Sequence, residues 1–420
     1  MVYPHDFERK TGFDQIRAMT AEKCLSPAGA EQAFRSVFSN DYDSLRNELV
    51  KTWEFQQILS FDDPFPAVAF SDVRKILEKL RIEGTFPETE ELSGLKGTLD
   101  YLKSVLNYFK ARKEGAYPVL KSVVNRVKFY PFVSDSIDRI IDKHGAVRDN
   151  ASPGLKKIRN EIASKKTAVT GRLTAILKQA QSEGIVDADA NISVRNGRGV
   201  IPVSISGKRK INGLIHDQSA TGKTVFIEPS EIVELNNEII ELGYEERREI
   251  VKILTSFADS IRSYIDDLVE SFGFLSEIDF IKAKALLGNE LGSILPALSA
   301  KPQLAWKKAV HPLLFKTFRK AGNRSVVPLD IELNEKQRIL LVSGPNAGGK
   351  SVCLKTTGLL QYMLQCGYTI PVGEGSEAGV FNDIFIDIGD EQSIENDLST
   401  YSSHLVNMKF FIRNTSPSSL

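Results

Sequence analysis

The stretch "LVSGPNAGGKSVCLKTTG", residues 341–358, decides the fold class of the C-terminal part of the chain. It contains the pattern G-x-x-x-x-G-K-[ST], formed by Gly344, Gly349, Lys350 and Ser351. Glycines at this spacing let backbone N–H groups turn inward around phosphate oxygens, and the start of the next helix adds the positive end of its dipole. The lysine offers a point charge to the β- and γ-phosphates, and the serine offers a hydroxyl to Mg²⁺. The stretch therefore predicts a loop that holds the phosphates of a nucleotide.

The flanking sequence supplies the context that such a loop requires. "RILLVS" (338–343) reads as a buried strand and "SVCLKTTGLLQYML" (351–364) as a helix. Further upstream, "VVPLDIELNEKQRILLVSG" (326–344) reads as strand, turn and strand, and downstream "YTIPVG" (368–373) and "NDIFIDIG" (382–389) read as short strands. Together these segments predict an α/β nucleotide-binding domain.

A second match to the end of this pattern, "TGKT" at 221–224, is rejected. The first glycine would have to be residue 217, which is Asp217, and a carboxylate there repels phosphate.

Composition indicates a cytoplasmic globular protein with no membrane partner. The formal net charge is zero, so any nucleic-acid role has to come from a local patch. The 3 cysteines are widely spaced and contain no C-x-x-C pair, which favours a reduced compartment without a disulfide framework or zinc site. The N-terminus has no apolar targeting segment, and no run of residues approaches the length of a membrane span.

Before the nucleotide-binding domain, the chain reads as helical, with one β-rich insert. Residues 1–150 carry apolar side chains at helical spacing, as in "DYDSLRNELVKTWEFQQILS" and "FSDVRKILEKLRIEG". Two longer apolar seams predict an antiparallel, coiled-coil arm. Their members are Leu155, Ile158, Ile162, Val169, Leu173, Ile176 and Ala180 in the first seam, and Ile232, Leu235, Ile239, Leu242, Ile250, Leu254, Phe257, Ile261 and Leu268 in the second.

The insert between the two seams reads as a small sheet at the tip of the arm. "GVIPVSIS", "INGLIHD" and "KTVFIEP" are its expected strands. From 152 to 229, basic residues outnumber acidic ones by about two to one. A solvated surface would explain this excess, and so would a mobile tip that grips phosphates by releasing counterions. The candidate nucleic-acid contacts are Arg195, Arg198, Lys208, Arg209 and Lys210.

No complete catalytic set is visible in the sequence. Asp387 and the pair Asp390-Glu391 follow only a short apolar run, so we do not assign them as magnesium carboxylates. The next segment begins a helix rich in hydroxyls, of the kind that a partner subunit would offer to a γ-phosphate, although an ordinary capped helix start also explains it. His5, His144 and His216 are expected to be surface or structural residues, and His404 follows the hydroxyl-rich segment.

Five segments, in this order along the chain, resemble the MutS family of ATPases, and within it the second paralogue branch (MutS-two). They are "DKHGAVRDNASPGLKKIR", "GLIHDQSATGKTVFIEPSEIVELNNEI", "AVHPLL", "LVSGPNAGGKSVCLKTTGLL" and "FIDIGDEQSIENDLSTYSSHL". The resemblance implies a multidomain, mainly helical protein with a helical arm, a small β clamp tip and a P-loop ATPase domain of the ABC type.

The resemblance also assigns domains and residues. It implies a helical core and lever at 1–150 with a return helix at 270–300, a clamp at 151–269 with its β-rich tip at 192–229, and the first part of the ATPase domain at 301–420. "HPLL", from His311, and "VVPLDI" match segments that flank the nucleotide base. The implied ATP-binding residues are Gly344, Pro345, Asn346, Ala347, Gly348, Gly349, Lys350, Ser351 and Val352, with Mg²⁺ at Ser351. Ser399 and Thr400 match the signature that reaches the ATP of the opposite subunit, which implies a homodimer.

The resemblance further implies what relatives carry beyond "RNTSPSSL", the end of this chain. There they continue into a strand that ends in Asp-Glu, the magnesium and water carboxylates, and then into a coiled coil and a small nuclease domain. We therefore expect a front part of such a protein, truncated within its ATPase domain, with weakened nucleotide binding and almost no hydrolysis.

Two functions remain open on this resemblance. One is an ATP-dependent clamp on double-stranded, branched or recombining DNA that suppresses homologous recombination. The other is a ribosome-associated ATPase that separates collided ribosomes, gripping rRNA or the ribosome surface. Phosphate contacts carry no base information, so the sequence does not separate these two. An SMC-like structural ATPase fits less well because those proteins place the phosphate loop before the arm. Mismatch reading is not expected, because the separate N-terminal domain that inserts an aromatic side chain is missing, and Tyr3 and Phe7 suit a core or interface.

Overall fold

The computed structural model describes residues 1–322, 325–345, 349–388 and 397–420. The chain forms two compact units, each built from segments that are separated in sequence. The first unit comprises Met1–Arg74, Gly97–Phe129 and Asp266–Leu420, and the second comprises Lys75–Lys96 and Tyr130–Ile265. The chain crosses between the units inside α5 (Arg74–Leu80), α6 (Thr89–Lys110) and α11 (Ile265–Leu291), and between α7 (Pro118–Val124) and α8 (Pro131–Ile140).

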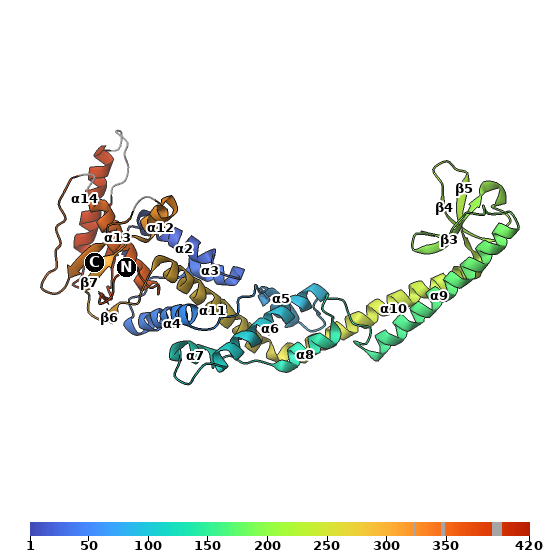
Figure 1. The fold of residues 1–420 in the computed structure, drawn as a ribbon, viewed down its shortest axis with the longest axis horizontal. Coiled ribbons are helices and arrows are strands. Elements are labelled where there is room, and N and C mark those ends of the chain that lie inside the picture. Colours follow the sequence, from blue (N-terminus) through green and yellow to red (C-terminus); the bar gives the residue numbers. More distant parts are fainter. Residues whose placement is uncertain (323–324, 346–348, 389–396) are drawn as a thin grey trace. The chain divides into compact units, whose positions relative to one another are not determined.

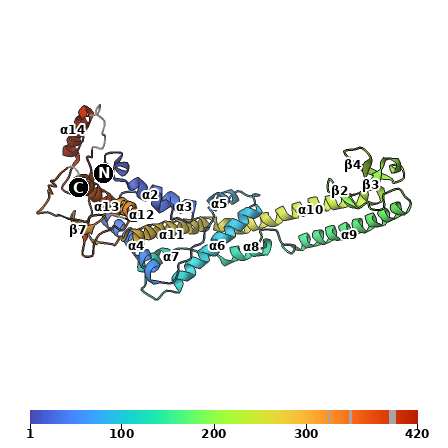
Figure 2. The same cartoon turned by 45° about the horizontal axis from the view of Figure 1, so that its top comes forward.

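Two long antiparallel helices dominate the second unit and form the predicted arm (Figures 1 and 2). These are α9 (Pro153–Ser182) and α10 (Ser230–Ile261), which run side by side. Ser152 starts α9 because its hydroxyl accepts a hydrogen bond from the N–H of Leu155, and Pro153 fits the first turn, where no N–H is needed. The first seam is confirmed in outline. Leu155, Val169, Leu173 and Ala180 are buried, whereas Ile158, Ile162 and Ile176 are half-buried, and Leu177 is an additional buried residue.

A four-stranded antiparallel sheet lies at the end of the arm, in the strand order β2-β3-β5-β4. Its strands are β2 (Ser193–Arg195), β3 (Arg198–Ser204), β4 (Gly213–Gln218) and β5 (Thr224–Pro229). The three predicted strands are confirmed, and β2 is an additional one. Asn196 and Gly197 join β2 to β3 with φ angles of 52° and 76°, the backbone of a two-residue type I′ hairpin turn. Short 3₁₀ turns at Ile205–Gly207 and Arg262–Tyr264 complete the unit.

The first unit is mainly helical, with two small sheets. Besides α7 and parts of α6 and α11, its helices are α1 (Phe7–Thr11), α2 (Phe13–Ala21), α3 (Pro27–Arg35), α4 (Tyr42–Phe61), α12 (Pro312–Ala321), α13 (Lys350–Gln365) and α14 (Asp397–Asn414). A mixed sheet has the order β6-β9-β7-β8, from β6 (Ala297–Ser299), β7 (Leu304–Ala309), β8 (Leu329–Leu333) and β9 (Glu377–Gly379). β1 (Val2–Tyr3) pairs in parallel with β10 (Ile384–Phe385).

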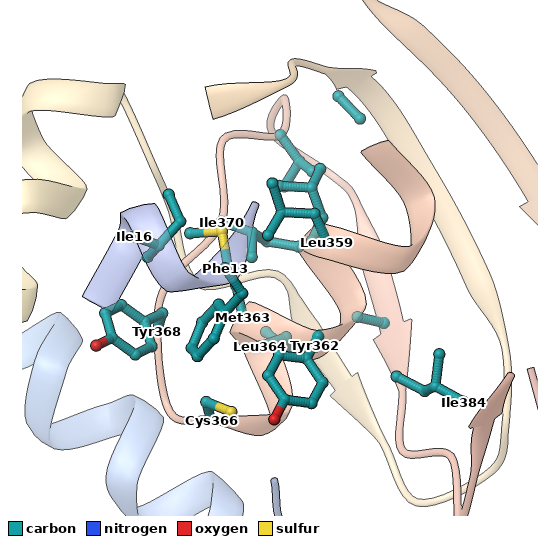
Figure 3. Packing of buried hydrophobic residues seen from close by; sticks show 14 of the residues in the cluster. Phe13, Ile16, Leu359, Tyr362, Met363, Leu364, Cys366, Tyr368, Ile370 and Ile384 are labelled. Atoms are coloured by element: carbon teal, nitrogen blue, oxygen red, sulfur yellow. The ribbon is translucent and has the colours of Figure 1, made fainter. Parts of the chain in front are cut away.

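Helix α13, which follows the phosphate loop, is anchored in the core of the first unit (Figure 3). Phe13 of α2 packs edge-on against Tyr362 of α13, with their ring centroids 4.7 Å apart. The Tyr362 hydroxyl donates a hydrogen bond of 2.6 Å to Glu8 Oε1, and Glu8 in turn pairs with Arg17. Phe7, 1% exposed, belongs to the same cluster, so its predicted core role is confirmed. The N-terminal helices therefore hold the far end of the helix that begins at the phosphate loop.

Two strand predictions in the first unit are wrong. Residues 338–343 form no strand, and Ile339 and Leu341 are 90% and 89% exposed. A strand needs a neighbour, and no ladder to this segment is formed by the described residues. "YTIPVG" makes only a single bridge, between Ile370 and Ile294, and "NDIFIDIG" contributes the two residues of β10.

Candidate functional site

The phosphate loop opens directly into α13, as the sequence predicts. Gly349 is the residue before the helix and has a φ angle of 84°, a left-handed conformation that side chains with a Cβ rarely adopt. This conformation lets the backbone turn sharply, so that the first N–H groups of α13 lie at the end of the loop. Asn346, Ala347 and Gly348, predicted to bind phosphates, lie outside the described residues.

Lys350 reaches back across the loop. Its ammonium donates to the carbonyl oxygens of Gly344 and Pro345, at 2.5 and 2.8 Å. Within the described parts of the chain, no carboxylate pairs with it. A lysine ammonium is strongly hydrated and seeks an anion, and neutral carbonyls are weak substitutes for one. The charge is therefore available to a phosphate placed in the loop.

Ser351 and Val352 are exposed in the first turn of α13. The Ser351 hydroxyl makes no hydrogen bond to the described residues, so it is free to bind a ligand. Mg²⁺ is usually held by one or two protein oxygens together with phosphate oxygens and water. A single exposed hydroxyl beside a phosphate loop fits this donor set, whereas no cluster of three or more His, Cys, Asp or Glu side chains occurs among the residues described.

An apolar cavity of about 440 Å³ adjoins Lys350 and Ser351. Its walls come from α13, β8, β10 and the extended segment before the loop, and include Leu340, Val342, Leu354, Ile384, Ile386 and Leu420. The ion-binding end of the loop is thus polar, while the walls behind it are mostly apolar.

His311 lies at the start of α12 and is buried. Burial, together with the charge of Lys355, lowers the pKa of His311 to about 4, so the imidazole is neutral at pH 7. Its Nδ1 has no hydrogen-bond partner in the described structure. The resemblance placed this segment beside the nucleotide base, and that placement stays a prediction.

Three side chains form a hydrogen-bonded group around Asp387, just after β10. Asp387 accepts hydrogen bonds from His404, at 2.5 Å to Nδ1, and from Asn407 at 2.8 Å, and the hydroxyl of Tyr3 donates to Asn407. Both carboxylate oxygens of Asp387 therefore accept hydrogen bonds from neighbouring side chains. Asp390 and Glu391 fall in the part of the chain that is not described, as do the side chains of Ser399 and Thr400, although α14 includes both of the latter residues.

The five candidate basic residues of the tip fall into two groups. Arg195 pairs with Asp217 at 3.1 Å and lies over the ring of Phe226, 4.2 Å from its centroid. Arg198 is 18% exposed and makes two hydrogen bonds of 2.9 Å to Glu228. Both guanidinium groups therefore already have anionic partners.

The other three, Lys208, Arg209 and Lys210, form what we call the basic triplet. All three are exposed, and none pairs with a carboxylate among the described residues. The triplet follows the 3₁₀ turn at Ile205–Gly207, which closes on the end of β3, and precedes β4. Folding thus concentrates the unpaired positive charge of the five candidates into one short loop at the tip.

A buried polar network at the tip was not predicted. Glu228 is fully buried and accepts hydrogen bonds from Arg198, from Asn236 at 2.6 Å and from His216 at 2.5 Å. The network joins β3, β4, β5 and α10, so His216 has the structural role expected of it. The signal in the sequence was a lone glutamate within the apolar run "TVFIEP", since a buried carboxylate needs donors nearby.

No helix among the described residues is both long and apolar enough to cross a membrane.

Comparison with known proteins identifies the family. The model for MutS domain V matches residues 340–420, the range that contains the phosphate loop. The chain is 35% identical over 410 residues to the endonuclease MutS2 of Geobacillus sp. (strain WCH70), which covers 97% of this chain and 51% of that protein. The MutS2 of Alkaliphilus oremlandii is 35% identical over 409 residues, with 97% and 51% covered, and that of Halalkalibacterium halodurans is 33% identical over 399 residues, with 94% and 50% covered. The chain spans about half the length of the curated relatives that it matches. With the loop, the order of its motifs and this identity along almost its whole length, the chain belongs to the MutS2-type family.

Proposed function

We propose that this chain is the nucleotide-binding and nucleic-acid-gripping part of an ATP-dependent DNA clamp. The observation that carries the proposal is the geometry of Lys350. Its ammonium lies beside a glycine loop at a helix start, and its partners among the described residues are two carbonyl oxygens. Membership of the MutS2-type family supports ATP as the nucleotide.

At the loop, three groups act on the triphosphate. The N–H groups at the start of α13 donate to phosphate oxygens, Lys350 neutralises charge on the β- and γ-phosphates, and Ser351 offers its hydroxyl to Mg²⁺. Bound Mg²⁺ would supply charge neutralisation between the β- and γ-phosphates. Ser399 and Thr400 would reach the nucleotide of a second copy, so that ATP binding and homodimer formation become linked equilibria.

At the tip, the basic triplet would contact the nucleic-acid backbone. Three cations in one loop release counterions on binding, and this gives affinity without sequence preference. Arg195 and Arg198 hold the tip sheet together instead, through Asp217 and Glu228. We favour branched or recombining DNA as the target, and the ribosome is the alternative that the experiment below separates.

Equilibrium binding of a fluorescent ATP analogue tests the nucleotide site. With Mg²⁺ present, Lys350→Ala should weaken binding at least about tenfold, because a charge-assisted contact to phosphate contributes roughly 1.5–3 kcal/mol. Lys336→Ala removes an exposed lysine between β8 and the loop and should leave the affinity unchanged. Equal affinity of the wild-type chain and Lys350→Ala would refute the nucleotide assignment.

A salt series tests the nucleic-acid interface. The triple variant Lys208→Ala, Arg209→Ala, Lys210→Ala should reduce the slope of log affinity against log salt by about 2–3 on a labelled four-way junction. The control Lys156→Ala, Lys157→Ala, Lys166→Ala removes the same charge from the exposed face of α9 and should change the slope by less than about 1. Equal slopes for the two variants would refute the tip as the interface. Triplet-dependent binding to ribosomes but not to the junction would favour the ribosome alternative.

A further inference from the structure

The arm is not packed uniformly along its length. Its outer part belongs to the core of the tip, where Val169, Leu173, Leu177 and Ala180 of α9 and Ile232 of α10 are buried together with side chains of the sheet. At the foot of the arm, Leu155 of α9 and Leu254, Phe257, Ala258 and Ile261 of α10 are buried as well. Both ends of the arm therefore have an apolar core.

Between these ends lies a stretch that we call the joint, formed by residues 156–168 of α9 and 237–247 of α10. Every residue of the joint is described, and Leu242, 9% exposed, is its one buried side chain. Thirteen helical residues correspond to about 20 Å of arm. Helices in proteins owe most of their stability to packing of an apolar face, so this length of the arm is weakly supported.

Charged pairs add to the sparse apolar contact of the joint, where Ile158, Ile162 and Ile239 are only half-buried. Arg159 pairs with Glu246 at 2.7 Å and Lys165 pairs with Glu238 at 2.6 Å, both across the two helices. Such half-exposed pairs contribute little and weaken as salt rises. Part of the joint's stability therefore depends on ionic strength.

A glycine lies inside the joint. Gly243 is in the interior of α10, where glycine disfavours the helix relative to alanine. A Cβ built on Gly243 meets no atom within 4 Å, so close packing does not require this residue to be glycine. Weak packing, salt-dependent pairs and an interior glycine coincide in one stretch of the arm.

We propose that the joint is a flexible hinge that lets the tip change direction relative to the foot of the arm, and that ionic strength sets its stiffness. The bending occurs where α9 and α10 open together over residues 156–168 and 237–247, while the tip and the foot stay folded. This inference goes beyond the proposed function, because it concerns the arm alone and holds whatever the tip binds.

Hydrogen exchange of the whole chain tests the hinge. Amides of the joint should exchange at least about tenfold faster than those of 169–180, which share the apolar core of the tip. Raising NaCl from about 50 to 500 mM should speed exchange in the joint about two- to threefold and leave 169–180 unchanged. Equal protection of the two stretches, or no response of the joint to salt, would overturn the proposal.

Two matched pairs of variants separate the hinge from general fraying. Gly243→Ala should slow exchange in the joint about fivefold, whereas Gly171→Ala, an interior glycine of α9 whose Cβ also meets nothing within 4 Å, should leave the joint unchanged. The double variant Arg159→Gln, Lys165→Gln should reproduce the effect of high salt. The control Lys156→Gln, Lys157→Gln removes two exposed charges that pair with no carboxylate among the described residues, and it should not.

The bending itself is measured as a distance distribution between spin labels placed by noncanonical amino acids at the exposed Ser206 in the tip and Lys143 at the foot. A hinge gives a broad distribution that Gly243→Ala narrows. A narrow distribution that neither salt nor Gly243→Ala changes would show a rigid arm and overturn the proposal.

Discussion

Two short apolar stretches, "GVIPVSIS" in the tip and "RILLVS" before the phosphate loop, have similar compositions but different structures. The first becomes β3, with Val200, Ile201 and Val203 fully buried. The second stays extended and unpaired, and its Ile339 and Leu341 face solvent. The stretch in the tip has its partner strands within about thirty residues, and a tight Asn-Gly turn joins it to one of them. No such partner strand for the other stretch occurs in the described parts of the chain. A strand is a property of a pair of segments, and composition alone supplies only one of the two.

The largest loss of stability is expected when the buried carboxylate of the tip, Glu228, is removed. Glu228→Ala leaves Arg198 and Asn236 without their common acceptor, and should destabilise the tip sheet by about 3–5 kcal/mol. The readout is hydrogen exchange of β3 and β5, because both tryptophans, Trp53 and Trp306, lie in the other unit. As a control, the exposed Glu234→Ala should change exchange in these strands by less than the equivalent of about 0.5 kcal/mol.

Removing apolar contacts from β5, the strand that pairs with β3, should destabilise the tip somewhat less. Ile227 in β5 is 1% exposed, and Ile227→Ala should destabilise the tip by about 2–4 kcal/mol, since it removes buried methyl groups and leaves a cavity. Exchange rates of the β3 and β5 amides measure this effect. A change below about 1 kcal/mol would mean that the tip core is loosely packed, and the contrast with "RILLVS" would lose its basis.

Acid should also weaken the tip. Burial raises the pKa of Glu228, but the hydrogen bonds and the positive charge around it lower the pKa by more, so it lies below its ordinary value of 4.5. The unfolded tip then binds the proton more readily than the folded tip, and stability falls as the pH drops through 4.5 towards the folded pKa. Exchange measured between pH 6 and pH 3, after correction for intrinsic rates, should show this loss in the wild-type chain. A Glu228→Gln variant should show a flatter dependence, and an identical profile would contradict the role of this carboxylate.

The smallest change in stability is expected from a substitution in the unpaired stretch "RILLVS". Leu341→Ala should change the free energy of unfolding of the first unit by less than about 0.5 kcal/mol, because the side chain is 89% exposed. Fluorescence of the buried Trp306 during urea denaturation reports on this unit. If Leu341→Ala proved as costly as Ile227→Ala, the stretch would be packed in solution and the comparison would fail.

The parts of the fold that sequence could predict are those with local causes. The arm follows from apolar spacing and from the Ser152-Pro153 start of α9, and the tip strands follow from alternation and glycine turns. The glycine loop before α13 can likewise be predicted, because a run of consecutive residues specifies it. The unpaired state of "RILLVS" and the burial of Leu177, which the seam did not include, depend on neighbours far away in sequence, which a single sequence does not reveal.

The candidate site shows the same division. The pattern at 344–351 located Lys350 and Ser351 correctly at the start of a helix, although their role in ATP binding stays a prediction. At the tip, the basic excess identified five candidates, but which of them are free depended on Asp217 and Glu228, whose positions only the folded sheet defines. The number of basic residues can be read from the sequence, whereas their ion pairs are known only from the folded structure.

The parallel pairing of β1 with β10 has a consequence for synthesis. The N-terminal ammonium of Met1 donates to the carbonyl of Asn382, a partner 381 positions away. At the translation rates typical of cells, about 5–20 residues per second, the first strand waits about 20 to 80 s before β10 exists. During that interval Phe7 and Phe13 also lack Tyr362, the ring against which both of them pack. Until β10 is synthesised, the N-terminal segment therefore lacks both the partner strand and the aromatic ring that it packs against in the folded unit.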